Sequence, residues 1–382
     1  MRILHTSDWH LGRALCGERL LDDQCHVLAQ LVEVVKEFRP GAVIVAGDVY
    51  DRAIPSPEAV EALDEIVSQL VLDCDTNVIL LAGNHDSGAR LSFGSRVLAR
   101  NRLHVVGSLR DGPAVIRLHD EWGEVTFGVL PYTEPALAAY ELDCPTICDH
   151  DTAMRTAVER IRSLPLSRRT VLAAHTFVSG AETSESERTL TVGGAGTVAL
   201  DALDGFSYVA LGHLHRAQMV GRETVRYSGS LLKYAFSEEH HRKQVDLISL
   251  DAEGRSTVES VPLLPRRDVR TVEGKFNDLL RRGTEPNRAD LISITLLDTQ
   301  PILDARLRLS EVFPNVLQVQ QPNFQRPGGG PRESSRYANM SERDLFDAFF
   351  QQVSGRQLNA DEKEELDNAL EAIRTVEREV GA

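Results

Sequence analysis

The sequence lacks an excess of basic residues and any long apolar run. Its 382 residues include 42 Lys and Arg against 57 Asp and Glu, a formal net charge of −15 at pH 7. Such a surface repels nucleic acid over most of its area, so DNA binding would need a local patch, metal ions or a partner. No apolar stretch approaches the roughly 20 residues of a membrane helix, and polar residues follow at once after Leu4, so we expect neither a membrane span nor a secretory signal.

The cysteines also exclude a class of protein. There are five, with no C-x-x-C pair among them: Cys16, Cys25, Cys74, Cys144 and Cys148. An odd number without paired spacing argues against a disulfide framework and predicts a reduced, cytoplasmic location. The length predicts two or three domains with ample buried core.

Short apolar, β-branched runs alternate with amphipathic helical patterns over the first 260 or so residues. The expected strands are 2–5, 42–46, 77–82, 126–130, 170–174, 208–211 and 245–250. Between them, Ala59, Leu63 and Ile66 have helical spacing. This alternation predicts an α/β domain over residues 1–262. Residues 115–129 resemble a hairpin, so the sheet should be mixed.

The pattern changes near Arg266. Short strands (269–272, 291–296, 316–319) alternate there with short helices (276–280, 302–309), which predicts a small α+β domain over 266–325. Residues 326–340 are a Pro- and Gly-rich linker by composition. Residues 341–382 are predicted to form two amphipathic helices. These helices either dock back on the main body or bind a helix or coiled coil of a partner.

Polar clusters directly follow five of the expected strands. They are Asp8-Trp9-His10, Gly47-Asp48, Gly-Asn-His-Asp at 83–86, His175, and Gly212-His213-Leu214-His215. Each alone is a weak signal, because a single polar residue after a strand is usually a turn former. Ligand sites in α/β sheets form beyond the carboxyl ends of strands, so the five together indicate one functional site.

The residue types in these clusters indicate metal chemistry. The candidate ligands are Asp8, His10, Asp48, Asn84, His175, His213 and His215. Seven ligands exceed what one ion needs and fit two ions with one bridging carboxylate. Mixed oxygen and nitrogen ligands suit Mn²⁺, Fe or Zn²⁺. Two ions about 3.5 to 4 Å apart can clamp a phosphate, so the expected reaction class is phosphoester hydrolysis.

These motifs are similar to those of the calcineurin-like metallophosphoesterases. The longer strings at 5–12, 47–51, 212–215 and 227–230 resemble the bacterial SbcD branch of that superfamily. The resemblance implies a four-layer αββα sandwich carrying a small α+β capping domain and a C-terminal helical pair. It places the first ion on Asp8, His10 and His215. It places the second ion on Asn84, His175 and His213, with Asp48 as the bridge.

The resemblance also implies one catalytic residue. His85 corresponds to the histidine that stabilises the transition state and protonates the leaving oxygen, a role that suits a side chain titrating near neutrality. Archaeal and eukaryotic relatives carry a second histidine three residues after the bridging aspartate, whereas this chain has Asp51 there. The role of Asp51 is therefore left open.

The function implied by the resemblance is that of a manganese-dependent DNA nuclease, with two Mn²⁺ ions. It would be a 3′ to 5′ exonuclease on double-stranded DNA and an endonuclease on single strands and hairpins, active in double-strand break and hairpin processing at the nucleoid. Its partner would be an SbcC-type coiled-coil ABC ATPase bound through the C-terminal helices, since this chain has no phosphate-binding G-x-x-x-x-G-K-[ST] loop. Relatives form a homodimer within a heterotetramer, and 56–72 and 91–99 are the candidate contact helices here.

Two other functions stay open on sequence. The same fold and metals serve small-molecule phosphodiesterases and protein phosphatases, because sites rather than folds decide function. A non-catalytic scaffold with a relic metal site is the other alternative. Trp9, which lies between two candidate ligands, is expected to pack in the core rather than to stack on a base.

Overall fold

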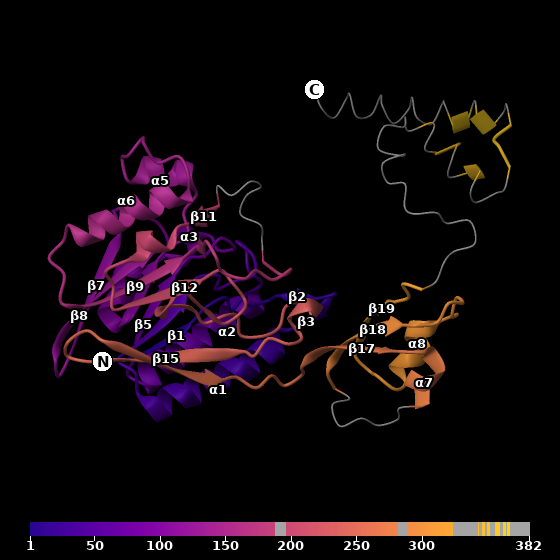
Figure 1. The fold of residues 1–382 in the computed structure, drawn as a ribbon, viewed down its shortest axis with the longest axis horizontal. Helices are drawn as coiled ribbons and strands as arrows, with labels where there is room; N and C mark the ends of the chain where they lie inside the picture. Colours follow the sequence, from indigo (N-terminus) through magenta and orange to yellow (C-terminus); the bar gives the residue numbers. More distant parts are fainter. Residues whose placement is uncertain are drawn as a thin grey trace. The chain divides into compact units, whose positions relative to one another are not determined.

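The computed structural model describes residues 1–187, 196–281 and 289–323, with scattered positions between 343 and 366 (Figure 1). The chain forms two compact units, one of Met1–Asp298 with Ile302–Pro322 and one of Thr299–Pro301 with Asn323–Ala382. The expected linker at 326–340 and most of the expected helical pair at 341–382 lie outside the described residues. Among the helices that are described, none is both long and apolar enough to cross a membrane.

The first of two large sheets has six strands in the order β16-β15-β1-β4-β5-β6. Their bounds are Ser256–Pro262, Gln244–Leu250, Arg2–Thr6, Ala42–Ala46, Asn77–Leu81 and Leu103–Val106. Strands β1, β4, β5 and β6 are parallel, and β15 joins β1 antiparallel. The sheet is therefore mixed, through β15 and β16 rather than through the hairpin expected at 115–129.

The second sheet also has six strands, in the order β13-β14-β12-β9-β8-β7. Their bounds are Gln218–Val220, Arg222–Tyr227, Tyr208–Gly212, Arg169–His175, Gly123–Leu130 and Ala114–Asp120. Strands β7 and β8 pair antiparallel, with Ala114 opposite Val129 at one end and Asp120 opposite Gly123 at the other. This pairing confirms the expected hairpin.

The two sheets pack face to face and are covered by helices on their outer faces (Figure 1). Between them, side chains such as Ile3 and Ile44 meet Phe127 and Tyr208 in one buried cluster. The outer face of the first sheet packs on α1 (Leu21–Phe38) and α2 (Pro57–Ser68). The outer face of the second packs on α5 (Pro135–Glu141) and α6 (His150–Arg162). This is the expected α/β fold in four layers, αββα.

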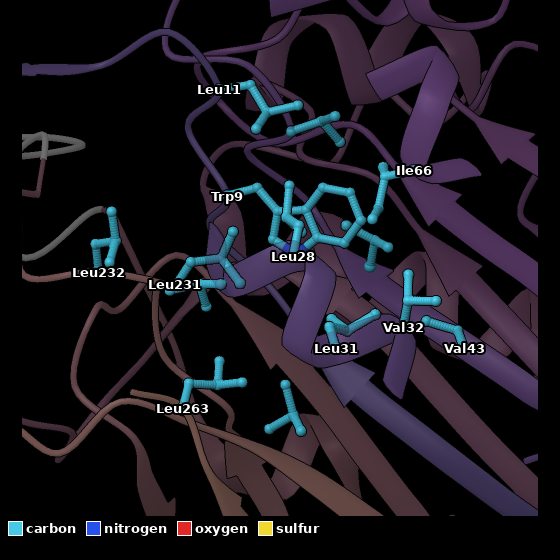
Figure 2. Close-up of a cluster of buried hydrophobic side chains, with 14 of the residues drawn as sticks. Trp9, Leu11, Leu28, Leu31, Val32, Val43, Ile66, Leu231, Leu232 and Leu263 are labelled. Atoms are coloured by element: carbon cyan, nitrogen blue, oxygen red, sulfur yellow. The ribbon is translucent and has the colours of Figure 1, made fainter. Parts of the chain in front are cut away.

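Trp9 belongs to the core between the first sheet and its helices. Its side chain is fully buried, and its Nε1 donates to Oγ1 of Thr6 over 2.9 Å. Figure 2 shows the indole among Leu11, Leu28 and Ile66. The prediction that Trp9 packs rather than stacks on a base is confirmed.

Residues after Arg266 build a separate three-stranded parallel sheet. Its elements are β17 (Val269–Gly274), α7 (Phe276–Arg281), β18 (Leu291–Leu296), α8 (Ala305–Ser310) and β19 (Val316–Gln320). They enclose a core of their own that includes Phe276, Ile294 and Phe313. Arg267 joins this part to α1 through an ion pair with Asp23 at 2.6 Å. Its role as a capping domain stays a prediction.

Short elements complete the described chain. They are β2 (Ala14–Leu15), β3 (Glu18–Arg19), η1 (Gln69–Asp73), α3 (Gly88–Leu91), α4 (Ser95–Leu98), η2 (Ala99–Asn101), β10 (Phe177–Val178), β11 (Thr197–Val198), η3 (Leu200–Leu203) and η4 (Phe236–Glu238).

Candidate metal centre

All seven candidate ligands lie at the carboxyl ends of strands from both sheets. Asp8 and His10 follow β1, Asp48 follows β4, and Asn84 follows β5. The second sheet contributes His175 at the end of β9, and His213 and His215 after β12. Six of the seven side chains are buried, and Asn84 is partly buried. The structure therefore brings the sequence-predicted residues together.

Backbone hydrogen bonds join the loop after β1 to the loop after β4. Asp8 N–H donates to the carbonyl oxygen of Gly47 over 3.0 Å, and His10 N–H donates to that of Asp48 over 2.9 Å. Leu11 N–H continues the series with Val49 over 2.9 Å. Three candidate ligands are thus held by backbone bonding that involves none of their side chains.

Four of the candidate ligands have positive φ. The angles are 52° at Asp8, 45° at His10, 49° at Asp48 and 114° at His213. Residues with a Cβ seldom adopt this region, and it costs of the order of 1 to 3 kcal/mol at each position. Strain of this kind collects at functional sites, where the surrounding structure holds the side chains in a required arrangement.

Two glycines of the motifs allow the close approach of ligand groups. A Cβ at Gly83 would collide with the Asp48 side chain and backbone. Gly47 has φ +89°, and a Cβ there would collide with the His175 ring. The glycines in Gly-Asp and Gly-Asn-His-Asp therefore serve the packing of the site itself.

Asp8, His10 and His215 form one group of donors. Ligand atoms of the three lie within 4.8 Å of one another. Nε2 of His10 and Nε2 of His215 are 3.0 Å apart. Two ring nitrogens at this separation can both reach an ion at the usual bond length of about 2.0 to 2.2 Å.

Asn84, His175 and His213 form the second group. Oδ1 of Asn84 lies 3.0 Å from Nε2 of His175 and 3.1 Å from Nδ1 of His213. Asp8 and Asp48 also approach His175 closely enough to form a donor set with it.

Asp48 lies between the two groups. Its Oδ2 is 3.6 Å from Nε2 of His10 and 3.6 Å from Nε2 of His175. Its Oδ1 accepts a hydrogen bond of 2.8 Å from the backbone N–H of His85. A carboxylate equidistant from one ligand of each group is placed as a bridge would be.

The electrostatics of the site favour cations. Burial, and then the neighbouring Asp48, raise the pKa of Asp8 well above its ordinary value. Burial lowers the pKa of His175 and of His215 to about 4, so both imidazoles are neutral at pH 7, which is the form that binds metal. Buried adjacent carboxylates among neutral imidazoles fit two divalent ions.

His85 lies beside the first group of donors. Its ring is 4.6 Å from the His10 ring in an edge-to-face arrangement, and its side chain is 7% exposed. Nδ1 of His85 lies 2.8 Å from the carbonyl oxygen of Asp51. Asp86 accepts from the backbone N–H groups of Gly83, Val49 and Tyr50 over 2.9 to 3.0 Å, so its carboxylate supports the loop.

A buried network behind His215 escaped prediction from the sequence. Nδ1 of His215 lies 2.5 Å from Oγ of Ser186 and 3.4 Å from Oε1 of Glu238. Lys243 Nζ donates to the other oxygen of Glu238 over 2.7 Å and to the His215 carbonyl oxygen over 2.8 Å. Glu187 accepts from the backbone N–H of His215 over 2.7 Å. The charge-rich composition around Glu238 and Lys243 is typical of a solvated loop and gives no sign of burial.

Two family models match the sequence of this chain. The sequence model of the calcineurin-like phosphoesterases matches residues 1–217, which is more than half of the chain. The chain belongs to the calcineurin-like phosphoesterase family. A second family model, that of the SbcD C-terminal domain, described as the type 5 capsule protein repressor C-terminal domain, matches residues 265–354. The two matches support an SbcD-type nuclease.

Solved structures that are similar to the chain include the following three. A dimetal phosphatase from Danio rerio is 14% identical, with a TM-score of 0.45, over 69% of this chain and 97% of that one. The protein TT1561 of Thermus thermophilus is 14% identical, with a TM-score of 0.38, over 68% and 98%. GAP50 of Plasmodium, an anchor in the inner membrane complex, is 9% identical, with a TM-score of 0.37, over 87% and 98%.

As a calcineurin-like phosphoesterase, this chain is a metal-dependent enzyme. The family and the buried clusters of His and Asp side chains together indicate two divalent ions.

Proposed function

We propose that this phosphoesterase is a two-metal DNA nuclease that uses Mn²⁺. The position of Asp48 carries the proposal, with Oδ2 at 3.6 Å from a histidine of each donor group. Asp8, His10 and His215 would hold the first ion. Asn84, His175 and His213 would hold the second, and Asp48 would bridge them. Such a pair of ions neutralises a phosphodiester, activates water and stabilises both the attacking and the departing oxygens.

The protein groups around the ions have separate tasks. The Asp51 carbonyl oxygen only accepts hydrogen bonds, so Nδ1 of His85 carries a hydrogen and Nε2 is the nitrogen that gives or takes a proton. As an imidazolium, His85 can protonate the leaving oxygen from Nε2. Asp48 fixes the His85 backbone through Oδ1, which couples the placement of the acid to that of the bridge.

DNA is the proposed substrate because of the C-terminal family match. That match, to the SbcD C-terminal domain, supports activity at DNA ends and hairpins together with an SbcC-type ABC ATPase. The net charge of −15 is consistent with a partner that supplies much of the DNA contact. Exposed apolar side chains at Leu72, Phe93 and Val97, which are 74%, 88% and 68% exposed, support a homodimer within the assembly.

The test compares substrates on the full chain, alone and with its ATPase partner, in Mn²⁺. We expect cleavage of end-labelled linear and hairpin DNA, with 3′ to 5′ shortening of duplex ends, that is abolished by a chelator. Hydrolysis of a small phosphoester without DNA cleavage would favour a phosphodiesterase or phosphatase. No hydrolysis of either substrate would favour a scaffold.

A further inference from the structure

The carboxylate of Asp51 lies between two buried nitrogens that lack hydrogen-bond partners among the described residues. These nitrogens are Nδ1 of His10 and Nη1 of Arg13. Oδ1 of Asp51 is 3.7 Å from the first and 3.5 Å from the second. His10 is fully buried, and the Arg13 side chain is 15% exposed. A buried polar nitrogen without a partner is costly, and the Asp51 carboxylate is an acceptor that faces both nitrogens.

We infer that Asp51 is a positioning residue that accepts the Nδ1 hydrogen of His10 and so directs Nε2 of His10 toward the first ion. The inference rests on the proposed assignment of His10 as a metal ligand. Histidines that bind a metal through one nitrogen usually donate from the other to a carboxylate or carbonyl group, which fixes both tautomer and ring orientation. For His175, the corresponding acceptor is the carbonyl oxygen of Ala46, which lies 2.9 Å from Nδ1.

The backbone presents Asp51 to His10 independently of any side chain. Asp51 N–H donates to the carbonyl oxygen of Leu11 over 3.2 Å, and Leu11 N–H donates to Val49 over 2.9 Å. The residue that follows His10 is thus bonded directly to Asp51.

The same residue also holds the proposed acid. The carbonyl oxygen of Asp51 accepts from Nδ1 of His85, while its carboxylate faces Nδ1 of His10. The two rings are in edge-to-face contact at 4.6 Å. Asp51 therefore fixes a ligand of the first ion and the acid relative to each other.

A third cation on these residues is the competing interpretation. Ligand atoms of His10, Asp51 and His85 do lie within 4.8 Å of one another. However, Nε2 of His10 already faces His215 at 3.0 Å, so a further ion on Nδ1 would require an imidazolate. The Arg13 guanidinium at 3.5 Å from the Asp51 carboxylate would also repel a cation. The geometry favours a hydrogen-bond acceptor.

Arg13 extends the arrangement to the other histidine of the first ion. Its Nη2 donates to the carbonyl oxygen of Ser186 over 2.7 Å, and Oγ of Ser186 lies 2.5 Å from Nδ1 of His215. The guanidinium also lies over the Tyr234 ring at 4.9 Å. Asp51 thus supports His10 directly and is connected to His215 through Arg13 and Ser186.

The experiment measures Mn²⁺ binding by calorimetry and by the electron paramagnetic resonance of bound Mn²⁺, on the full chain. Asp51→Asn and Asp51→Ala are compared with wild type and with Asp22→Asn, whose carboxylate is exposed and lines the same pocket as Asp51. We expect affinity for one of the two ions to fall about 10- to 100-fold in Asp51→Ala, with less loss in Asp51→Asn, because an amide oxygen still accepts. Asp22→Asn should bind both ions as wild type does.

Wild-type affinity for both ions in Asp51→Ala, with the fold intact by circular dichroism, would overturn the inference. A third Mn²⁺ in wild type that disappears in Asp51→Ala would overturn it in favour of a cation site. If Asp51→Ala fails to fold, Asp51→Leu carries the test, because leucine fills the space and offers no acceptor, and wild-type affinity for both ions there would overturn the inference. DNA cleavage on wild type is scored separately: an affinity loss without wild-type cleavage supports Asp51 while contradicting the nuclease.

Discussion

The carbonyl oxygen of Asp51 accepts a hydrogen bond from Nδ1 of His85 over 2.8 Å. This contact fixes the tautomer of His85, because a carbonyl oxygen cannot donate. It leaves Nε2 as the nitrogen available for the proposed proton transfer. The tautomer of His85 is therefore set by the main chain of the loop after β4.

Asn84→Ala should remove one of the two ions. The change deletes Oδ1, which lies 3.0 Å from Nε2 of His175 and 3.1 Å from Nδ1 of His213. The second donor group then keeps only its two imidazoles. We expect metal content to fall from about two ions to about one, and cleavage to fall at least about 100-fold. Native mass spectrometry and inductively coupled plasma measurements give the content. Asn101→Ala, an exposed position, is the control; unchanged metal content in Asn84→Ala would contradict the ligand assignment.

Glu238→Gln should reduce both stability and metal affinity. Burial alone would raise the pKa of Glu238, but Lys243 and His215 lower it below its ordinary value, so the side chain is an anion paired with a buried ammonium. Removing that charge leaves Lys243 unpaired and should cost about 3 to 5 kcal/mol in the free energy of unfolding, measured in urea.

The double variant Glu238→Gln with Lys243→Met separates the two effects. It removes both buried charges and should recover most of the stability, whereas the contact with His215 stays weakened. Affinity for the first ion should remain about 10-fold below wild type. Wild-type affinity for the first ion in the double variant would mean that Glu238 supports the fold but not the metal centre.

The fold was predictable where local patterns and burial agree. Apolar β-branched runs such as 42–46 and 208–211 are buried on both faces, so their composition alone marks them as strands. Edge strand β16 escaped prediction, because most of its residues are exposed and its apolar content is low. The strand-end motifs then placed the candidate ligands, since carboxyl ends of parallel strands meet at one edge.

The supporting parts of the site were not predictable. Positive φ at Asp8, His10 and Asp48 is imposed by backbone bonding between loops that are far apart in sequence. The pairing of Lys243 with Glu238 depends on tertiary burial, and in sequence the two belong to a segment of mixed charge. The position of Asp51 between His10 and Arg13 likewise emerges only when the loops after β1 and β4 are joined.

Stability should depend on pH through Asp120 and Arg169. The guanidinium donates to both carboxylate oxygens over 2.6 and 2.7 Å and holds the pKa of Asp120 well below its usual range. A depressed folded-state pKa means that the pair stabilises the fold above the unfolded value of about 3.9 and that this contribution is lost as pH falls.

The variant Asp120→Asn should therefore lower the free energy of unfolding by about 2 kcal/mol at pH 7. The difference from wild type should shrink progressively below about pH 4, because Asp120 takes up a proton in the unfolded chain while it is still ionised in the folded protein. Asp111→Asn, at a side chain that is 87% exposed, should change it by less than about 0.5 kcal/mol. Urea unfolding from pH 3 to pH 8 measures both, and a difference that does not vary with pH would refute the assignment.

Deleting 341–382 should remove binding of the ATPase partner. The deleted residues belong to a different compact unit from the metal centre, so the remaining chain should keep its fold and its metal content. A pull-down with the SbcC-type ATPase measures the loss, and circular dichroism checks the fold. Recovery of the partner at full strength would assign these residues another task.

The most direct test of the account is cleavage of end-labelled linear and hairpin DNA in Mn²⁺ by wild type and by His85→Ala at equal metal occupancy. We predict cleavage by wild type and a loss of about 100-fold or more in His85→Ala, because the two ions remain while the acid is gone. Equal cleavage by the two proteins would contradict the role of His85. No DNA cleavage by wild type, with or without its ATPase partner, would contradict the nuclease.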